Sequence, residues 1–174
     1  MNIMRLMLLG TIIGAGLVGC SAGPVRETGS LAHCDNLILD MEQGTLNGVT
    51  PAISQDEAKT KFPCYTGSTA EGGMWNYGGG VFFINDDFYI YTAKDYIEVR
   101  KNFTGKVTGD WLGKSRDTLM ASFGEPSIMK NERYYYARPY GCLRFDLDKQ
   151  HIRQIAVHAT SCEAALKVFD DEQE

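Results

Sequence analysis

The chain has 174 residues, of which 22% are charged, and its formal net charge is −5 at pH 7. This length supports one domain or two small fused units. The chain has no block of positive charge, which argues against nucleic acid as a partner. No apolar run after residue 19 is long enough to cross a membrane.

Residues 1–19 resemble the signal peptide of a bacterial lipoprotein. Residues 1–5 carry one positive charge, and residues 6–18 are apolar apart from one threonine, a run too short to span a bilayer. The segment ends in Leu17-Val18-Gly19-Cys20, which is similar to a lipobox and implies cleavage before Cys20 and lipid attachment to that residue. Ser21 in the next position favours the outer membrane, with the protein facing the periplasm and held to the membrane through its lipid only. An ordinary secretory signal with a chance cysteine is the alternative.

The two ends of the cleaved chain are expected to lie outside the folded units. Cleavage would remove Arg5 and change the formal charge from −5 to −6. Residues 21–33 are small and polar without periodicity, so residues 20–34 are expected to be the lipidated cysteine and a flexible tether. Residues 161–174 are expected to be a C-terminal segment that ends in an acidic tail.

A shift of the chain against itself by 61 residues indicates a tandem repeat, with one unit at residues 35–96 and a second at 97–160. The coincident positions fall on glycines, helix starts and strand positions, so the order of structural signals repeats as well. Chance similarity is the alternative. The identical pairs are Gly44/Gly105, Gly48/Gly109, Ser54/Ser115, Asp56/Asp117, Phe62/Phe123, Glu71/Glu132, Gly80/Gly141 and Asp87/Asp148.

Each unit predicts one short helix. The helices span residues 55–62 and 116–123, with Ser54 and Ser115 as their N-caps. An acidic residue follows in the first turn of each helix, and Ser54 also fits a capping box with Glu57. Proline and glycine residues directly after the two helices are expected to end them.

An antiparallel meander is expected after each helix, so the predicted fold class is α+β with two tandem helix-plus-meander units. In the second unit, strands are predicted at residues 133–136, 141–145 and 150–158. In the first unit, the matching strands are residues 74–77, 80–84 and 88–93. Two glycines at 78–79 and an Asn-Asp-Asp run at 85–87 are predicted as the turns between them.

The glycine-rich and acidic residues 72–87 have two chemical interpretations, both weaker than a hairpin. A phosphate loop needs a helix after its glycines, whereas Gly80 leads into the strand-forming run 81–84. A calcium loop needs alternating oxygen ligands and a distal glutamate, which the acidic run does not supply. No cofactor and no metal site are therefore predicted.

The sequence contains no recognisable catalytic constellation, so a protein that is not an enzyme is expected. His151 and His158 lie an odd number of residues apart on one predicted strand. They therefore face opposite sides and cannot share one ion or one proton. The chain has no G-x-S-x-G elbow. A carboxylate pair brought together only by the fold would be the remaining route to an envelope hydrolase.

Four cysteines remain after Cys20, and in an oxidising periplasm they predict two disulfides. The pairs Cys34–Cys64 and Cys142–Cys162 are favoured among the three possible connectivities, because each bridge then lies within one half of the chain. Zinc is the competing interpretation, but the chain has no C-x-x-C pair.

Side-chain alternation predicts which face of the second meander meets the core. Leu143, Phe145 and Leu147 alternate with polar residues, so these three are expected to face the core. Arg144 is expected to face outward.

The 61-residue match transfers this alternation to the first unit. It places Phe82 and Ile84 toward the core, and Val81 and Phe83 outward. An outward aromatic patch commonly marks a protein interface, although a second layer covering this face is the alternative. The candidate partner-binding residues are Phe83, Tyr89, Tyr91, Trp111, Tyr135 and Arg144.

The second unit, from Gly105 to about Ala159, resembles the SmpA/OmlA (BamE-like) family of small outer-membrane lipoproteins. Two such units in tandem are similar to the β-lactamase inhibitor protein fold, in which two helix-plus-sheet repeats form a concave binding surface. The first unit departs from the family pattern at its helix ending, Phe62-Pro63-Cys64. The residues that carry the resemblance are Gly113–Asp117, Phe123–Pro126, Tyr134–Tyr136 and Leu143–Asp146.

The resemblance implies a lipid-anchored, periplasm-facing envelope protein that binds another protein, as an accessory of an envelope assembly. The inhibitor-like fold and the acidic charge imply an alternative, an inhibitor or immunity protein that blocks a periplasmic toxin or enzyme. The resemblance identifies no binding residue.

Overall fold

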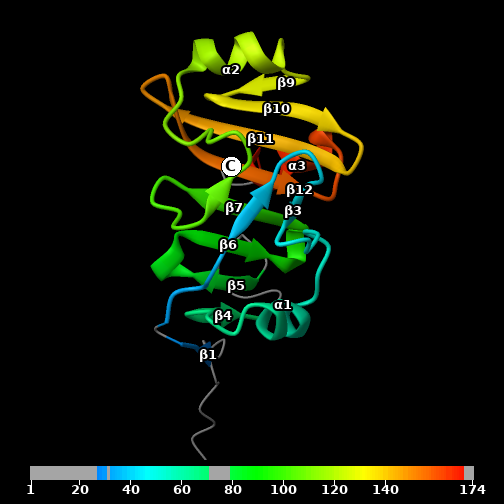
Figure 1. The fold of residues 1–174 in the computed structure, drawn as a ribbon. Coiled ribbons are helices and arrows are strands. Elements are labelled where there is room, and N and C mark those ends of the chain that lie inside the picture. Colours follow the sequence, from blue (N-terminus) through cyan, green and yellow to red (C-terminus); the bar gives the residue numbers. More distant parts are fainter. Residues whose placement is uncertain (1–26, 31, 71–78, 171–174) are drawn as a thin grey trace, which may run out of the picture.

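The computed structural model describes residues 27–30, 32–70 and 79–170 (Figure 1). These residues form a mixed α and β fold with three α-helices and two β-sheets, in which most neighbouring strands are antiparallel. The α+β class predicted from the sequence is therefore confirmed. Within the described residues, no helix is both long and apolar enough to cross a membrane.

The larger sheet has nine strands in the order β1-β4-β5-β6-β7-β12-β11-β10-β9. All its neighbouring strands are antiparallel, and β7 and β12 meet at its centre. The strands are β1 (Glu27–Thr28), β4 (Gly67–Thr69), β5 (Gly80–Phe83), β6 (Phe88–Tyr91), β7 (Tyr96–Arg100), β9 (Ile128–Lys130), β10 (Arg133–Arg138), β11 (Gly141–Asp148) and β12 (His151–His158).

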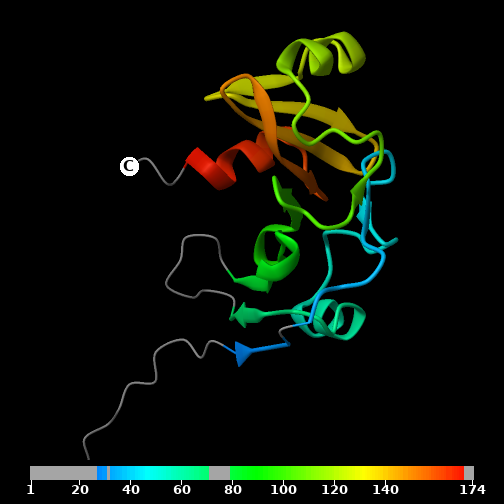
Figure 2. The ribbon, with the colours of Figure 1, turned by 60° about the vertical axis from the view of Figure 1, so that its left-hand side comes forward.

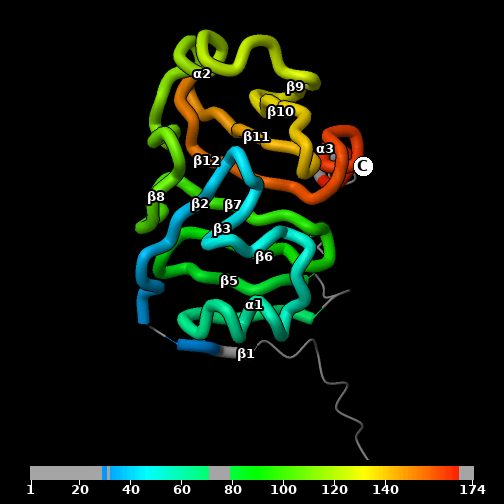
Figure 3. Tube along the Cα trace, turned by 45° about the vertical axis from the view of Figure 1, so that its right-hand side comes forward, coloured from blue at the N-terminus to red at the C-terminus, as the bar shows by residue number. Residues whose placement is uncertain are grey.

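The smaller sheet has three short strands in the order β3-β2-β8. It lies across the middle of the larger sheet, between α1 and α2 (Figures 1 and 3). The pairing of β2 with β8 is parallel and joins residues far apart in the chain. The strands are β2 (Ile38–Asp40), β3 (Thr45–Leu46) and β8 (Lys106–Val107).

Two of the three helices were predicted from the sequence. Helix α1 (Gln55–Lys61) begins at the N-cap Ser54, which forms the expected capping box with Glu57. Helix α2 (Arg116–Phe123) begins at Ser115, whose hydroxyl accepts a hydrogen bond from the third residue of the helix, and it ends at a glycine. Helix α3 (Cys162–Asp170) lies in the segment predicted only as a C-terminal extension.

The two faces of the larger sheet pack against different elements (Figure 2). We call the face covered by α1, α2 and the smaller sheet the helix face, and the opposite face, which contacts α3, the α3 face. The main hydrophobic core lies on the helix face. It contains Leu143, Phe145 and Leu147 as predicted, together with Leu119 of α2 and Ala58 of α1.

The predicted orientation of β5 is wrong. Val81 and Phe83 are fully buried in the core of the helix face, whereas Phe82 lies on the α3 face and Ile84 is 51% exposed. The 61-residue match paired Gly80 at the start of β5 with Gly141 at the start of β11. In the sheet, however, β5 is the strand next to β4, as β10 is the strand next to β9, so β5 corresponds to β10 and not to β11. Ten residues separate β4 from β5 but only two separate β9 from β10, so a match without gaps cannot keep both in register.

The remaining strand predictions agree with the structure where it describes the chain. β10, β11 and β12 overlap the three strands predicted for the second unit, and β5 and β6 overlap two of those for the first. The predicted turn at residues 85–87 is a short 3₁₀ turn that ends at Asp87 in the left-handed region, with φ 53°. The predicted strand at residues 74–77 lies outside the described residues.

Both predicted disulfides are present. Cys34–Cys64 joins the segment before β2 to the segment after α1, with 5.3 Å between its Cα atoms. Cys142–Cys162 joins β11 to the first residue of α3, with 5.0 Å between its Cα atoms. The second bridge therefore fixes α3 to the sheet.

Candidate functional site

The α3 face carries aromatic and charged side chains, in contrast to the apolar helix face. Because side chains alternate along a strand, every second residue of β5, β6, β7, β12, β11 and β10 lies on this face. They include Phe82, Tyr89, Tyr91, Tyr96, Glu98, Arg100, His158, Ala156, Asp146, Arg144, Cys142 and Tyr135.

Helix α3 covers the half of this face that β10 and β11 form. Ala165 of the helix is fully buried in a cluster with Tyr135 and the disulfide Cys142–Cys162. Further along the helix, Val168 packs against a second cluster that extends toward the centre of the sheet. The β10–β11 half is therefore closed by the chain itself.

The half formed by β5 and β6 carries an aromatic patch, which we define as Phe82, Tyr89, Tyr91 and Arg100. Phe82, Tyr89 and Arg100 are partly exposed, whereas Tyr91 is buried at 6% exposure. The Arg100 guanidinium carbon lies 4.0 Å from the centre of the Tyr89 ring, a cation–π contact. Rigid aromatic rings and arginine are the side chains that contribute most to protein interfaces.

A line of ring contacts connects the aromatic patch to the centre of the sheet. The Tyr89 and Tyr91 rings are stacked at 6.2 Å between centroids, and Tyr91 stacks on Tyr96 at 4.3 Å. Tyr96 in turn stacks on His158 at 4.8 Å. The patch is therefore flanked on one side by the buried rings of Tyr96 and His158, which limits the rotamer freedom of Tyr91.

Beside these rings, five charged residues of alternating sign cross the sheet. Glu98 bonds Arg100 at 2.6 Å and Arg144 at 2.9 Å, and Arg144 contacts Asp146 at 2.8 Å. The Arg133 Nε atom lies 3.8 Å from Asp146. Burial by itself lowers the pKa of Arg144, but Asp146 and Glu98 outweigh burial and hold that pKa above its ordinary value.

The small side chain of Ala156 makes the ion pair between Glu98 and Arg144 possible. Ala156 of β12 pairs with Glu98 on one side and with Arg144 on the other, so the two charged residues are one strand apart. Its methyl group leaves room for their side chains to meet across β12. Glu98 and Arg144 are 2% and 0% exposed, so their charges compensate each other away from water.

His158 is a neutral residue at the end of the ring stack. Its Nε2 atom lies 3.5 Å from a nitrogen of the buried Arg144 guanidinium. Burial first, and then the positive charge of Arg144, lower the pKa of His158 well below its ordinary value. His158 therefore stays uncharged near neutral pH.

The structure separates the six predicted partner-binding residues. Tyr89 and Tyr91 belong to the aromatic patch, while Tyr135 lies fully buried under α3. The outward prediction for Phe83 is wrong, since Phe83 lies in the core of the helix face. Arg144 lies on the face opposite Leu143 and Phe145, as the alternation predicted, but it is fully buried instead of exposed. Phe83 stacks on Phe88 in the core, and Arg144 is buried because Glu98 and Asp146 neutralise its charge.

Trp111, the sixth candidate, lies on the helix face of the molecule. It packs edge-on against Phe123 of α2 at 4.9 Å and lines a hollow of about 460 Å³ together with Met41 and Arg138. It is partly exposed and remains a candidate contact, separate from the aromatic patch. The predicted lipidation residue, Cys20, lies outside the described residues.

The sequence analysis missed three residues of the α3 face that matter for this site. Phe82 was assigned to the core because of the wrong register, and Glu98 and Arg100 were not singled out. The alternation of Glu98 and Arg100 with Ile97 and Val99 in the sequence was the signal that could have identified them.

The chemistry available on this face is recognition by rings and paired charges. Among the residues that the structure describes, no group of three or more histidine, cysteine, aspartate or glutamate side chains could hold a metal ion. Comparison of the chain with protein-family models, with curated proteins and with solved structures finds no match.

Proposed function

We propose that this chain is a lipid-anchored, periplasm-facing protein of the outer membrane that binds another protein through the aromatic patch and is not an enzyme. The observation that carries this proposal is the partial exposure of Phe82, Tyr89 and Arg100 beside the stacked, buried rings of Tyr91 and Tyr96. Aromatic residues that are fixed in place bury area at a low entropic cost. The role that fits the lipoprotein resemblance is an accessory of an envelope assembly.

The order of elements supports the proposal of two similar units in tandem. Helix α1 is followed along the chain by β4, β5, β6 and β7, and helix α2 by β9, β10, β11 and β12. Each set of strands runs from the centre of the sheet to its edge with its last strand innermost: β7-β6-β5-β4 on one side and β12-β11-β10-β9 on the other. A serine N-cap begins both helices. The aromatic patch then belongs to the first unit, at whose boundary Val168 of α3 packs against the cluster that contains Tyr91.

The proposal is tested by capture of partners from solubilised envelope membranes. Replacing Phe82→Ser and Tyr89→Ser together should weaken the captured partner's binding at least tenfold, because two anchor rings are lost. Ile84→Ser is the matched control: Ile84 is 51% exposed and lies next to β5 but outside the patch. Binding by the control should change less than twofold.

Two results would overturn the proposal. If the folded double variant kept every partner at full affinity, the aromatic patch would not be the binding surface. If a hydrolytic activity followed the pure protein through every purification step, the non-enzymatic role would be wrong.

An inhibitor or immunity protein is the second candidate function. The acidic chain, with a net charge of −5, favours a basic target, and the similarity to an inhibitor fold points the same way. Addition of the protein to its captured partner decides between the two: an inhibitor reduces the partner's activity, and an assembly accessory does not.

A further inference from the structure

The chain is fixed to the larger sheet from Glu27 onward, earlier than the tether boundary predicted at residue 34. β1 pairs with β4 at the edge of the sheet, with Glu27 opposite Ser68. The Gly29 and Ser30 amides then donate to the carbonyls of Thr66 and Tyr65, at 3.2 and 2.7 Å. The expected flexible tether is therefore wrong for the described residues from 27 on.

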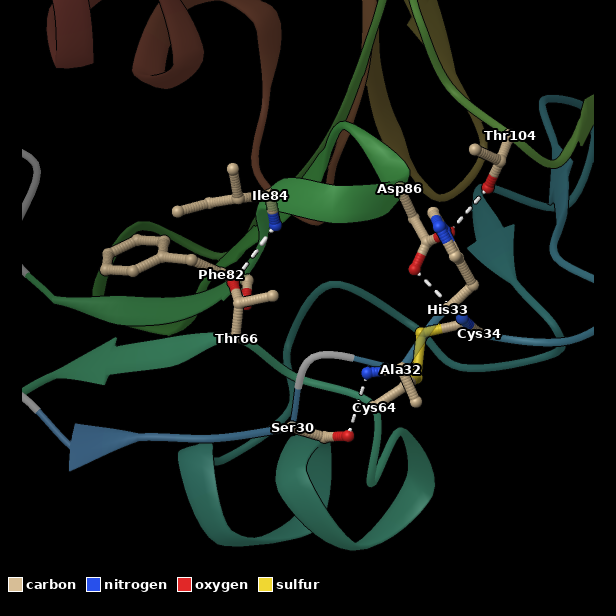
Figure 4. The surroundings of a disulfide bond; sticks show 10 residues. All are labelled: Ser30, Ala32, His33, Cys34, Cys64, Thr66, Phe82, Ile84, Asp86 and Thr104. Carbon is tan, nitrogen blue, oxygen red and sulfur yellow. Dashed lines mark hydrogen bonds and ion pairs between the residues drawn. A yellow bond between two sulfur atoms is a disulfide. The ribbon is translucent and has the colours of Figure 1, made fainter.

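A buried carboxylate secures the end of this fixed segment (Figure 4). Asp86, which is 1% exposed, accepts hydrogen bonds from the His33 ring at 2.8 Å, the Cys34 amide at 2.9 Å and the Thr104 hydroxyl at 2.7 Å. Burial raises the pKa of Asp86, but these hydrogen bonds outweigh burial and hold the pKa below its ordinary value. The Cys34–Cys64 disulfide closes the same site.

Only residues 21–26 then separate the fixed chain from Cys20, which carries the lipid in the proposed function. Fully extended, the path from Cys20 to Glu27 spans at most about 25 Å. β1 and β9 form the two edges of the nine-stranded sheet and lie at opposite ends of the molecule (Figures 1 and 3). At roughly 4.8 Å per strand, they are about 38 Å apart.

We propose that the anchored protein turns its β1 edge and α1 toward the lipid headgroups, with the β9 edge and α2 facing away. This inference rests on the lipid anchor of the proposed function. The reverse orientation would place Glu27 about 38 Å from the membrane, beyond the reach of the link. Lying on the α3 face would cover the aromatic patch that binds the partner.

The surface of α1 suits contact with headgroups. Its charges balance, with Asp56 and Glu57 in the first turn and Lys59 and Lys61 in the last. The large exposed hydrophobic residues of the described chain are Ile38, Ile84 and Met129, and none of them belongs to α1 or β4. The α1 end therefore meets the headgroup layer without inserting into the acyl chains.

The orientation is measured on the full-length lipidated protein, in vesicles of phosphatidylethanolamine and phosphatidylglycerol with a quencher attached to the headgroups. The same fluorophore is placed on Lys61→Cys in α1 or on Asp117→Cys in α2, both at exposed positions. Quenching should be at least threefold stronger at Lys61→Cys. Inserting twelve glycine and serine residues between Arg26 and Glu27 lengthens the link beyond the width of the sheet, and should reduce that ratio toward one.

Equal quenching of the two labels without the insertion, or stronger quenching at Asp117→Cys, would overturn the orientation while leaving the anchor intact. The anchor itself is tested by sedimentation with the vesicles, in which Cys20→Ser should lose the association. If Cys20→Ser sedimented as well as the unaltered chain, both the anchor and the orientation that rests on it would be wrong.

Discussion

Tyr89 and Tyr135 lie in the same row across the larger sheet, yet the two side chains differ in their exposure to solvent. The row runs from Tyr89 through Glu98, Ala156 and Arg144 to Tyr135. Tyr135 is completely buried under α3, whereas Tyr89 is partly exposed and is contacted by the Arg100 guanidinium. Two halves of one face thus carry similar rings in different surroundings.

The difference in burial predicts which half contributes more to stability and, in the proposed function, which half binds the partner. The α3-covered half is closed by a helix and by the Cys142–Cys162 bridge, so its rings contribute to folding. In the other half, Phe82, Tyr89 and Arg100 are partly exposed, so these side chains should contribute less to folding. In the proposed function they bind the partner. The five charged residues of alternating sign, which we call the charged row, connect the two halves: Arg100, Glu98, Arg144, Asp146 and Arg133. Variants on either side of that boundary should therefore differ in what they impair.

The largest effect is expected from Arg144→Met, which removes the charge that joins the two halves. Glu98 and Asp146 would stay buried with weaker compensation, so the free energy of unfolding should fall by about 3–5 kcal/mol. Denaturant unfolding at neutral pH measures this loss. Arg153→Met, at an exposed position of the same sheet, should change stability by less than about 0.5 kcal/mol.

Neutralising Glu98 and Asp146, the ion-pair partners of Arg144, distinguishes an electrostatic role of Arg144 from a role in packing alone. Combining Arg144→Met with Glu98→Gln and Asp146→Asn removes all three buried charges and should recover most of the lost stability, because the remaining Arg100 and Arg133 are 40% and 29% exposed. If the triple variant were as unstable as Arg144→Met alone, the charged row would not be the cause.

The next effect is expected from replacing Cys142 and Cys162 by serine. This bridge closes a sequence separation of 20 residues, so its loss should cost about 3 kcal/mol of unfolding free energy. It should also release α3, and hydrogen exchange should accelerate in β10 and β11 more than in β5 and β6. The paired serine variant at Cys34 and Cys64, which closes a separation of 30, should cost a similar amount without accelerating exchange in β10. Uniform acceleration in all four strands after loss of Cys142–Cys162 would contradict a role confined to one half.

A smaller, pH-dependent effect is expected from His158, whose pKa is lower in the folded than in the unfolded chain. Its stabilising contribution is complete above the unfolded pKa of about 6.5, and decreases as the pH falls from there toward the folded pKa, by at most about 1.4 kcal/mol per pH unit. Denaturant unfolding between pH 7 and 5 measures this slope, and His158→Gln should reduce it. His151→Gln, at an exposed position, should leave it unchanged. A slope that His158→Gln did not alter would assign the titration to another group.

Local chemistry made several features of this fold predictable from the sequence. Ser54 and Ser115 are N-caps because their hydroxyls satisfy free amides at the helix starts, a requirement that depends on a few neighbouring residues. The disulfide pairs were predictable because each joins cysteines within one half of the chain. The strands of the second half have strong alternation and short turns, which fixed their positions within a few residues.

Features that depend on the three-dimensional partner were not predictable. The side of the sheet on which Phe83 lies depends on the register of β5, and the longer connection before β5 shifts that register. Arg144 is buried because Glu98, 46 residues away in the chain, supplies the opposite charge. The attachment of His33 and Cys34 depends on Asp86, which was predicted from the sequence only as part of a turn. Lipidation of Cys20 stays a prediction.

The smallest effect on stability is expected from Tyr89→Ala. Measured together with Tyr135→Ala, this variant is the sharpest test of the difference between the two halves of the face. Tyr89 is partly exposed and contacts Arg100 and the Tyr91 ring at the surface, so its loss should cost about 1 kcal/mol or less. Tyr135 is fully buried, and its truncation should cost about 3 kcal/mol or more, because the cavity under α3 cannot collapse against a helix held by a disulfide. Partner binding should show the reverse order, with Tyr89→Ala weakening it tenfold and folded Tyr135→Ala leaving it nearly unchanged. Equal losses of stability in the two variants would mean that both halves of the face are closed, and that the aromatic patch is part of the core.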